Sequence, residues 1–184
     1  MIKRIISRLD IKNNFLVKGI NLEGLRVLGS PEEFAKKYYL ENIDELIFQD
    51  VVASLYKRNQ LSNLTKKISE DIFIPITVGG GIRNIEHANN LFKNGADKIA
   101  VNTAVTKNPE LISELALKFG SQSIVLSIEA KKNGENYWEA YTNTGRDHTG
   151  LNIIDWAKKG VDLGVGEILL TSIDNEGTRK GFDI

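Results

Sequence analysis

The sequence predicts an α/β fold, a (β/α)₈ (TIM) barrel, and three observations lead to this prediction. Short runs rich in Ile, Val and Leu alternate with amphipathic stretches, which is typical of a parallel sheet covered by helices. Several of these runs end in a polar residue, and in a barrel such residues form a ring at one end. A faint internal repeat relates the two halves of the chain, which an open sheet would not require.

The helices and strands can be placed from local signals. Ser30 suits an N-cap and Pro31 the first helical turn, and Gly95 is placed to end a later helix. A hairpin is expected with Asn133-Gly134 as its turn and residues 137–142 as its return strand. In chain order we expect strands at residues 4–11, 45–52, 74–78, 98–102, 123–130 and 167–173, and helices at 30–41, 60–70, 85–94, 109–120 and 153–163.

The repeat is clearest at the ends of the strands. Asp10 and Glu129 each stand at the end of an apolar run, and a lysine follows each of them two residues later. Glu45 and Glu167 open matching strands. Each pair is separated by about 120 residues, so the first strand matches the fifth and the second matches the sixth. We therefore expect a single barrel domain over residues 1–184 that stops after its sixth strand.

The composition argues against several classes of function. The 24 Lys and Arg residues balance the 24 Asp and Glu residues, so no nucleic-acid or membrane partner is indicated. No apolar run approaches the roughly 18 residues of a membrane span. The chain has no Cys, and His87 and His148 fit no ligand spacing. We expect no metal, no cofactor, no disulfide and a cytoplasmic location.

A phosphate site is predicted where a glycine-rich segment joins a strand to a helix. Gly80 and Gly81 would let the backbone approach an anion near a helix N-terminus, although a tight turn explains them equally well. Asn102 and Thr103, at the end of the next strand, could donate to the same phosphate or serve a turn or N-cap. Gly177, in the segment after the last strand, could also approach a phosphate.

Carboxylates at the strand ends are candidates for acid–base chemistry. Asp10 and Glu129 hold equivalent places in the repeat, which suits general acid–base work from opposite sides of a substrate. The alternative is an ion pair with a nearby lysine, such as Lys12, Lys18 or Lys131. Lys18 could instead pair with a substrate from a mobile loop.

Charged residues also open the strands at the end away from these acids. They alternate in sign, so an ion-pair ring could close the bottom of the barrel, although ordinary solvation is the usual fate of such charges. The ring would consist of Arg4, Glu45, Lys98 and Glu167.

Together with the motifs given below, these residues make the whole chain resemble the cyclase subunit family of imidazole glycerol phosphate synthase. The resemblance implies a barrel paired with a glutaminase, whose ammonia passes the charged ring and travels up the barrel. It also implies that the barrel cyclises a phosphoribulosyl-formimino aminoimidazole carboxamide ribonucleotide to imidazole glycerol phosphate. The motifs that carry it include Leu9-Asp10, Val17-Lys18-Gly19, residues 73–83, 95–98 and 119–122, and the segment 166–174.

The resemblance also implies roles for individual residues. Asp10 and Glu129 fall on the two catalytic acids, and the charged ring falls on the ammonia gate. A second phosphate site would come from strands beyond this chain. The positions that bind or orient substrate are Lys18, Asp50, Gly81, Asn102, Thr103, Asp174 and Gly177.

Three residues depart from the family pattern and open an alternative function. The family has Asp where this chain has Glu129 and Glu176, and commonly Cys where it has Arg8. A carboxylate displaced by about 1 Å can lower a rate about 10²-fold. These changes resemble a paralogous branch that passes ammonia to a sugar amidotransferase in surface-polysaccharide biosynthesis. We take the cyclase as the first hypothesis, this conduit as the second and a sugar-phosphate isomerase as a third.

Overall fold

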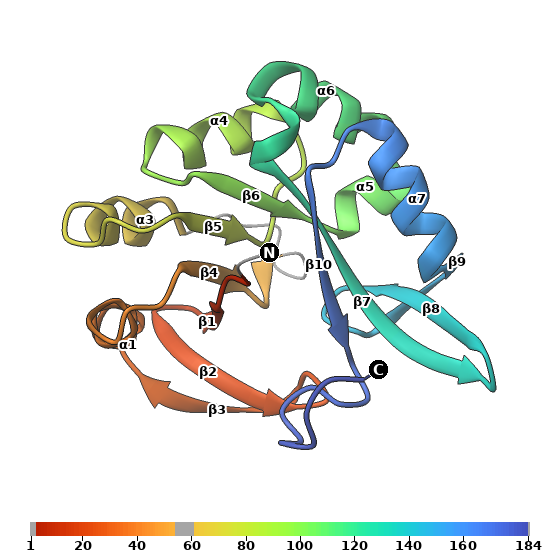
Figure 1. Cartoon of the computed structure of the whole chain (residues 1–184), viewed down its shortest axis with the longest axis horizontal. Helices are drawn as coiled ribbons and strands as arrows, with labels where there is room; N and C mark the ends of the chain where they lie inside the picture. The colour runs from red at the N-terminus through yellow and green to blue at the C-terminus, as the bar shows by residue number, and fades with distance from the viewer. Residues whose placement is uncertain (1–2, 54–60, 184) are drawn as a thin grey trace. The chain divides into compact units, whose positions relative to one another are not determined.

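A computed structural model describes residues 3–53 and 61–183 of the chain (Figure 1). The chain divides into two compact units, which are described separately. Unit 1 lies within Met1–Val17 and Val27–Ile99, and unit 2 within Lys18–Arg26 and Ala100–Ile184. Parallel strand pairs and helices occur in both units, which confirms the α/β class.

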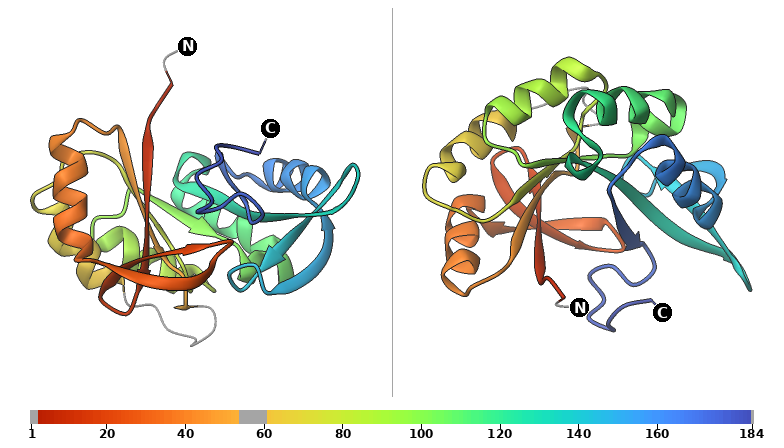
Figure 2. Two further views of the ribbon diagram at one scale, coloured as in Figure 1. Left: turned by 90° about the horizontal axis from the view of Figure 1, so that it is seen from below. Right: turned by 45° about the horizontal axis from the view of Figure 1, so that its top comes forward.

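Unit 1 contains a parallel sheet with helices along one face. Strand β1 pairs in parallel with β4, and β4 with β5, while β6 follows next in the sheet. The helices α1, α3 and α4 lie side by side outside these strands (Figure 2). The bounds are β1 Ile6–Lys12, α1 Pro31–Leu40, β4 Glu45–Asp50, α3 Leu61–Ser69, β5 Ile76–Gly79, α4 Ile85–Lys93 and β6 Lys98–Val101.

Unit 2 combines a parallel strand pair with an antiparallel meander. Strand β7 pairs in parallel with β10 and antiparallel with β8, which pairs antiparallel with β9. Helix α7 packs against α6, β7, β8 and β9. The bounds are α5 Thr103–Lys107, α6 Glu110–Phe119, a 3₁₀ turn at Ser121–Ser123, β7 Ile124–Gly134, β8 Tyr137–Thr142, β9 Asp147–Asn152, α7 Ile153–Leu163 and β10 Glu167–Ser172.

The helix boundaries follow the capping signals in the sequence. The Ser30 side chain accepts the N–H of Glu33 at 3.4 Å, and Pro31 opens α1, as predicted. Helix α4 ends before Gly95, whose φ of +93° is the left-handed conformation that favours glycine. Helix α7 occupies the predicted range and ends at Gly164 with φ of +109°. These predictions are confirmed.

The strands of unit 1 have one largely apolar face and an opposite face that carries most of their polar side chains. Side chains of parallel strands that pair in register share a face, and neighbours along a strand alternate between faces. The apolar face carries Leu46, Phe48, Ile76 and Val78, all buried. The opposite face carries Arg8, Asp10, Glu45, Gln49 and Thr77.

The two units repeat one another at the predicted positions. In unit 1, Asp10 of β1 pairs with Gln49 of β4, and Glu45 opens β4. In unit 2, Glu129 of β7 pairs with Thr171 of β10, and Glu167 opens β10. An antiparallel hairpin also follows β1 and β7, so both acids are flanked by a hairpin strand and a parallel strand. The repeat inferred from the sequence is therefore present in the strand pairing.

Several helices and strands of the structure were not predicted from the sequence, and one predicted turn lies elsewhere. The hairpin of β2 (Phe15–Ile20) and β3 (Glu23–Gly29), the short helix α5 and strand β9 were not expected. Asn133-Gly134 ends β7 and is not the hairpin turn, which falls at residues 135–136. Asn133 instead donates through its side chain to the Glu139 carboxylate, and Gly134 still pairs with Tyr137 of β8.

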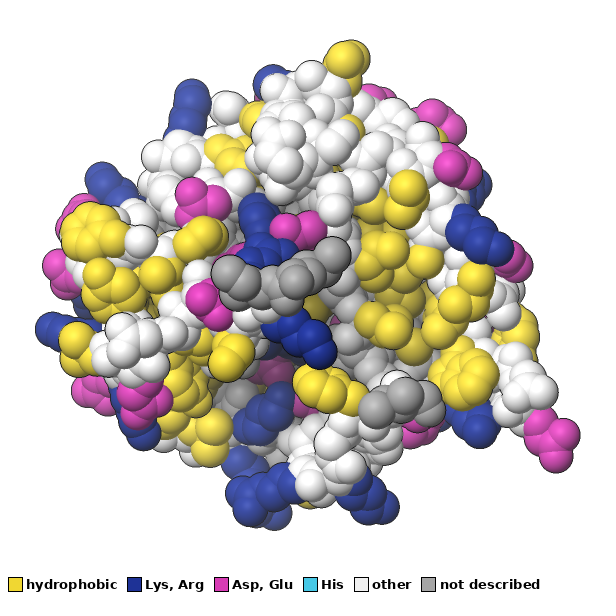
Figure 3. All heavy atoms as spheres, in the orientation of Figure 1, with side chains coloured by type: hydrophobic (Ala, Val, Ile, Leu, Met, Phe, Trp, Pro, Cys, Tyr) yellow, Lys and Arg dark blue, Asp and Glu magenta, His cyan; other side chains and the backbone are white. Residues whose placement is uncertain are grey.

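Apolar side chains remain exposed on unit 2. Figure 3 shows them gathered over the region of β10 and α7. On β10, Ile168 and Leu170 are 41% and 58% exposed, and on α7, Ile154 and Val161 are 57% and 56% exposed. Residues 168 and 170 alternate with Thr171 and Leu169, so they lie on the face of β10 opposite to that of Thr171.

Candidate functional site

Asp10, the first predicted acid, is buried in the middle of unit 1. Its side chain is 4% exposed, and Oδ1 accepts a hydrogen bond from Arg8 Nε at 2.7 Å. Arg8 lies two residues earlier on the same face of β1, and its side chain is 17% exposed. The sequence offered a lysine as the partner of Asp10. The structure places arginine there, because alternation along the strand brings residues 8 and 10 onto one face.

Gln49 is a polar residue near Asp10 that sequence reasoning missed. It pairs in register with Asp10 and lies on the same face of the sheet. Its Oε1 is buried and has no hydrogen-bond partner within the part of the chain that the structure describes. A buried amide oxygen is normally paired with protein or water. Glutamine inside an otherwise apolar strand run was the sequence signal that could have found it.

The predicted phosphate loop packs closely against the end of β4. Gly80 has φ of +105°, and a Cβ there would lie 2.5 Å from the carbonyl oxygen of Asp50, so only glycine fits. Asp50 accepts the N–H of Val52 at 3.0 Å through Oδ1. Gly81 has φ of +72°, and its carbonyl lies 3.2 Å from Nδ1 of His87. These contacts explain the glycines structurally, and phosphate binding by this loop stays a prediction.

The predicted charged ring is partly assembled within unit 1. Glu45 is buried and receives Arg4 Nη1 at 2.8 Å, Lys98 Nζ at 3.0 Å and the Thr77 hydroxyl at 2.8 Å. Arg4, Glu45 and Lys98 therefore form one cluster around a single carboxylate. Glu167, the fourth predicted member, belongs to unit 2, so its place in the ring stays a prediction.

Lys18, Asp174 and Gly177 are gathered in unit 2 by the loop that follows β10. Lys18, which lies in β2 and not in a loop, forms an ion pair with Glu176. Gly177 has φ of +72°, and a Cβ there would lie 2.2 Å from the carbonyl oxygen of Gly19. Asp174 Oδ2 accepts the N–H of Lys132 at 2.9 Å. The loop thus contacts both the β2 strand and the end of β7.

The hairpin of β8 and β9 in unit 2 contacts three further predicted residues. Glu129, which is 9% exposed, accepts the N–H of Gly145 at 2.9 Å through Oε2. Asn102 donates through Nδ2 to the carbonyl of Tyr141 at 3.3 Å. The Thr103 hydroxyl accepts the N–H of Asn143 at 3.3 Å. The structure thus brings Asn102, Thr103 and Glu129 to one hairpin, and their substrate contacts stay predictions.

Comparison with known proteins identifies the family. The profile of a family described as "Histidine biosynthesis protein" matches residues 4–184. The chain belongs to this family. A relative in Legionella pneumophila, "Imidazole glycerol phosphate synthase subunit HisF", is 60% identical over 181 residues, which cover 98% of this chain and 85% of the relative. HisF of Thermococcus onnurineus is 51% identical, and HisF of Pyrococcus furiosus is 50% identical. Each match covers 99% of this chain and 72% of the relative.

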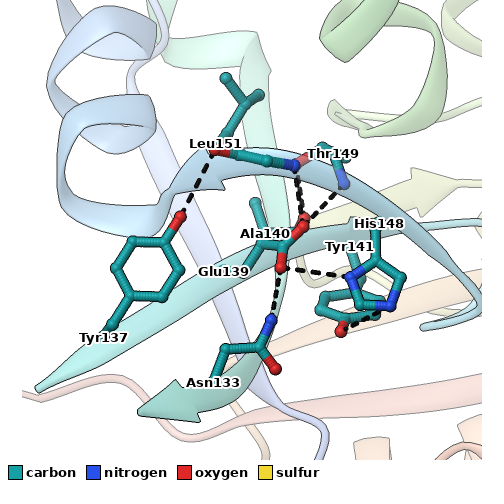
Figure 4. Close-up of polar contacts among 9 residues, drawn as sticks. Asn133, Tyr137, Glu139, Ala140, Tyr141, His148, Thr149 and Leu151 are labelled. Carbon is teal, nitrogen blue, oxygen red and sulfur yellow. Dashed lines mark hydrogen bonds and ion pairs between the residues drawn. The ribbon is translucent and has the colours of Figure 1, made fainter. Parts of the chain in front are cut away.

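A polar network in this histidine biosynthesis family member supports the β8–β9 hairpin (Figure 4). Glu139, which is buried, accepts the N–H groups of Thr149 at 3.0 Å and Gly150 at 2.8 Å. His148 Nδ1 lies 3.2 Å from Oε2, and the Asn133 amide donates to the same oxygen. The Gly150 N–H lowers the pKa of Glu139 below its ordinary value, against the opposing effect of burial. Sequence reasoning did not single out this network.

We expect Glu139→Gln to destabilise the protein at pH 7 by about 1–3 kcal/mol, because a carboxylate accepting several bonds loses its charge. The pKa is lower in the folded state, so this stabilisation is complete above the unfolded-state pKa of about 4.3. It is lost as the pH falls through the folded-state pKa. Urea unfolding of wild type and variant from pH 7 downward should show the difference shrinking.

The matched control is Glu135→Gln, an exposed residue in the turn between β7 and β8. We expect its free energy of unfolding to stay within about 0.5 kcal/mol of wild type at pH 7. A Glu139→Gln effect that grows as the pH falls would contradict the role assigned to the carboxylate.

Within residues 3–53 and 61–183, no group of His, Cys, Asp and Glu side chains is arranged to hold a metal ion. None of the helices in these ranges has both the length and the apolar character needed to cross a membrane.

Proposed function

We propose that this chain is the cyclase subunit of an imidazole glycerol phosphate synthase. It uses ammonia to form imidazole glycerol phosphate and aminoimidazole carboxamide ribonucleotide in histidine biosynthesis. The observation that carries the proposal is 60% identity, over 98% of the chain, to a relative named as this subunit. The equivalent buried carboxylates of the two units, Asp10 and Glu129, support it.

The chemistry assigned to these carboxylates is general acid–base catalysis. Ring formation and release of the ribonucleotide require protons to be taken up and given back at the substrate. Two carboxyl groups in different surroundings can divide these tasks. Asp10 has an arginine as its partner and Glu129 a backbone N–H, so their surroundings differ in this sense. Phosphate and substrate contacts are assigned to Lys18, Asp50, Gly80, Gly81, Asn102, Thr103, Asp174 and Gly177.

The finer architecture and the partner also belong to this proposal. We assign a (β/α)₈ barrel, in which β1, β4, β5, β6, β7 and β10 are successive strands. The partner is a glutaminase that supplies ammonia, and the charged ring at Glu45 would form its gate. A cytoplasmic location is in keeping with this biosynthetic role.

The test is turnover by the purified chain with ammonium as the nitrogen source. We expect imidazole glycerol phosphate to form from the phosphoribulosyl-formimino substrate, with mass spectrometry as the readout. A second preparation with the exposed α4 residue changed, Glu86→Gln, should behave as wild type. Folded protein, checked by circular dichroism, that forms no product would contradict the cyclase proposal.

A specific observation favours a second candidate, the ammonia conduit to a sugar amidotransferase. Arg8 pairs with Asp10 at 2.7 Å, and Lys18 pairs with Glu176, so one proposed catalytic acid and one proposed substrate-binding residue are each paired with an opposite charge of this chain. A conduit would keep the cluster around Glu45 without needing free acid–base groups. It predicts no product with ammonium, but transfer of nitrogen from glutamine to a sugar when glutaminase and amidotransferase are both added.

A further inference from the structure

We propose that the backbone N–H of Gly145, in the turn between β8 and β9, positions the Glu129 carboxylate, and that glutamate is the side chain this turn requires. The inference rests on the proposed acid–base role of Glu129. It makes Gly145 a positioning residue, since Gly145 would act on the substrate only through Glu129. The contact is the 2.9 Å hydrogen bond from Gly145 N–H to Oε2.

The strand pairing shows why the carboxylate reaches this turn. Glu129 lies on β7 between Tyr141 of β8 and Thr171 of β10, and pairs with both in register. Strand β8 runs antiparallel to β7 and continues only to Thr142 before it turns. The turn therefore begins two residues after the partner of Glu129. A side chain directed along the strand pair meets the backbone of that turn.

The turn itself has a backbone conformation that few sequences adopt. Asn143, Thr144 and Gly145 have φ of +53°, +61° and +72°, and these are consecutive left-handed residues. Glycine and asparagine enter this region readily, whereas threonine does so at a cost in free energy. Such a conformation persists when its surroundings hold it. Successive N–H groups in a tight turn also form concave sites that attract anions.

Contacts on both sides hold the turn in place. The Thr103 hydroxyl accepts the N–H of Asn143 at 3.3 Å, and Asn143 donates through its side chain to Asp147. The N–H of Arg146 closes the turn onto the carbonyl of Thr142 at 3.0 Å. The N–H of Gly145 is thus presented by a turn that is fixed at both ends.

A buried apolar cluster lies next to Gly145 of the same turn. Leu22, Tyr141 and Ile173 are buried together, each less than 5% exposed. A Cβ on Gly145 would lie 3.0 Å from Cδ1 of Ile173 and 3.3 Å from Cδ1 of Leu22. The Tyr141 ring lies 4.6 Å from the His148 ring between centroids, with the two planes tilted by 47°, which joins this cluster to the Glu139 network of Figure 4. A side chain at position 145 would therefore crowd Ile173 and Leu22 of this cluster.

The contact with Gly145 explains why the side chain at position 129 is glutamate and not aspartate. Aspartate is shorter than glutamate by one carbon–carbon bond, about 1.5 Å. An aspartate carboxylate on the same backbone would withdraw from Gly145 beyond hydrogen-bonding distance. A charge-assisted hydrogen bond to a backbone N–H also fixes the orientation of the carboxylate. Glu129 and the β8–β9 turn are therefore a matched pair, and glutamate is not a misplaced aspartate.

The first test uses nuclear magnetic resonance and needs no activity. In the ¹⁵N-labelled full chain at pH 7, Glu129→Gln should shift the Gly145 amide proton upfield, because a neutral amide is a weaker acceptor than a carboxylate. The amide of Gly150, which donates to Glu139 at 2.8 Å, is the internal control and should not move. An unchanged Gly145 amide in Glu129→Gln would overturn the proposal.

The second test uses the kinetics of ammonia-dependent turnover. Glu129→Asp should lower kcat by about 10²-fold with little change in KM, as expected for a misplaced acid–base group. Gly145→Ala should also lower kcat, and this effect should vanish in a Glu129→Gln background, since a coupled pair is not additive. A higher kcat for Glu129→Asp than for wild type would overturn the positioning role of Gly145. Additive effects of Gly145→Ala and Glu129→Gln on kcat would also overturn it.

The two tests separate this inference from the proposed function. If wild type does not turn over but the Gly145 amide responds to Glu129→Gln, the cyclase proposal fails and the contact stands. If wild type turns over and the amide does not respond, the function stands and the positioning role fails.

Discussion

Asp10→Asn is expected to lower kcat for ammonia-dependent cyclisation by about 10²–10⁴-fold, the usual contribution of a general acid or base. Asparagine has nearly the same shape and can still accept the hydrogen bond from Arg8 Nε through Oδ1. It cannot take up or release a proton at neutral pH. The steady-state rate with saturating ammonium, measured together with KM, should therefore fall in kcat while KM changes little.

The matched control for Asp10→Asn is Asp97→Asn. Asp97 is also a carboxylate of unit 1, and it accepts the N–H of Ile76 at 2.8 Å, at the start of β5. Its loss removes the same charge from the same unit without touching the proposed site. We expect kcat close to wild type. Equal losses of kcat in the two variants would show that Asp10 acts through stability or net charge and not through proton transfer.

Glu45→Ala is expected to destabilise the protein by about 3–5 kcal/mol, as is typical when one member of a buried ion pair is removed. Glu45 has a side chain only 2% exposed, and Lys98 one that is 13% exposed, so their 3.0 Å contact is shielded from water. Removing the carboxylate leaves a largely buried ammonium group without this compensating charge. Urea unfolding measures the loss.

Comparing Arg4→Gln with Glu45→Ala separates the effect of burial on the free energy of unfolding from the effect of losing one charge of the cluster. The Arg4 side chain is 49% exposed, although it also contacts Glu45 at 2.8 Å. Exposed pairs contribute about 0–1 kcal/mol, so this variant should lose no more than that. Glu45→Gln keeps a group that can accept from the Thr77 hydroxyl and should lose about 1–3 kcal/mol. Similar losses for Arg4→Gln and Glu45→Ala would contradict the assigned role of burial.

The same cluster offers a functional readout if a glutaminase is the partner. The proposed gate lies at Glu45, where Arg4 and Lys98 meet one carboxylate. A variant that folds, such as Glu45→Gln, should change turnover with glutamine as the nitrogen source more than turnover with added ammonium. Equal changes in glutamine-dependent and ammonium-dependent turnover would show that Glu45 stabilises the fold and has no role in ammonia passage.

Much of the fold was accessible from the sequence because its signals are local. The caps at Ser30 and Gly95 act through neighbouring residues, and apolar runs of strand length alternate with helical stretches along the chain. The match between Asp10 and Glu129 was visible as a repeat, and the strand pairing bears it out. The same repeat could have predicted the β2–β3 hairpin, since a hairpin was expected after the matching strand β7.

What the sequence determined by itself was therefore the α/β class, most element boundaries, the family, and the list of residues to test. The tertiary structure decided which atoms those residues meet. Arg8 contacts Asp10 because strand alternation puts them on one face, and Gly145 reaches Glu129 because an antiparallel hairpin returns beside it. Contacts of this kind depend on strand register and turn geometry over long separations. Local sequence patterns do not encode them, which is why the partner of Glu129 emerged only from the fold.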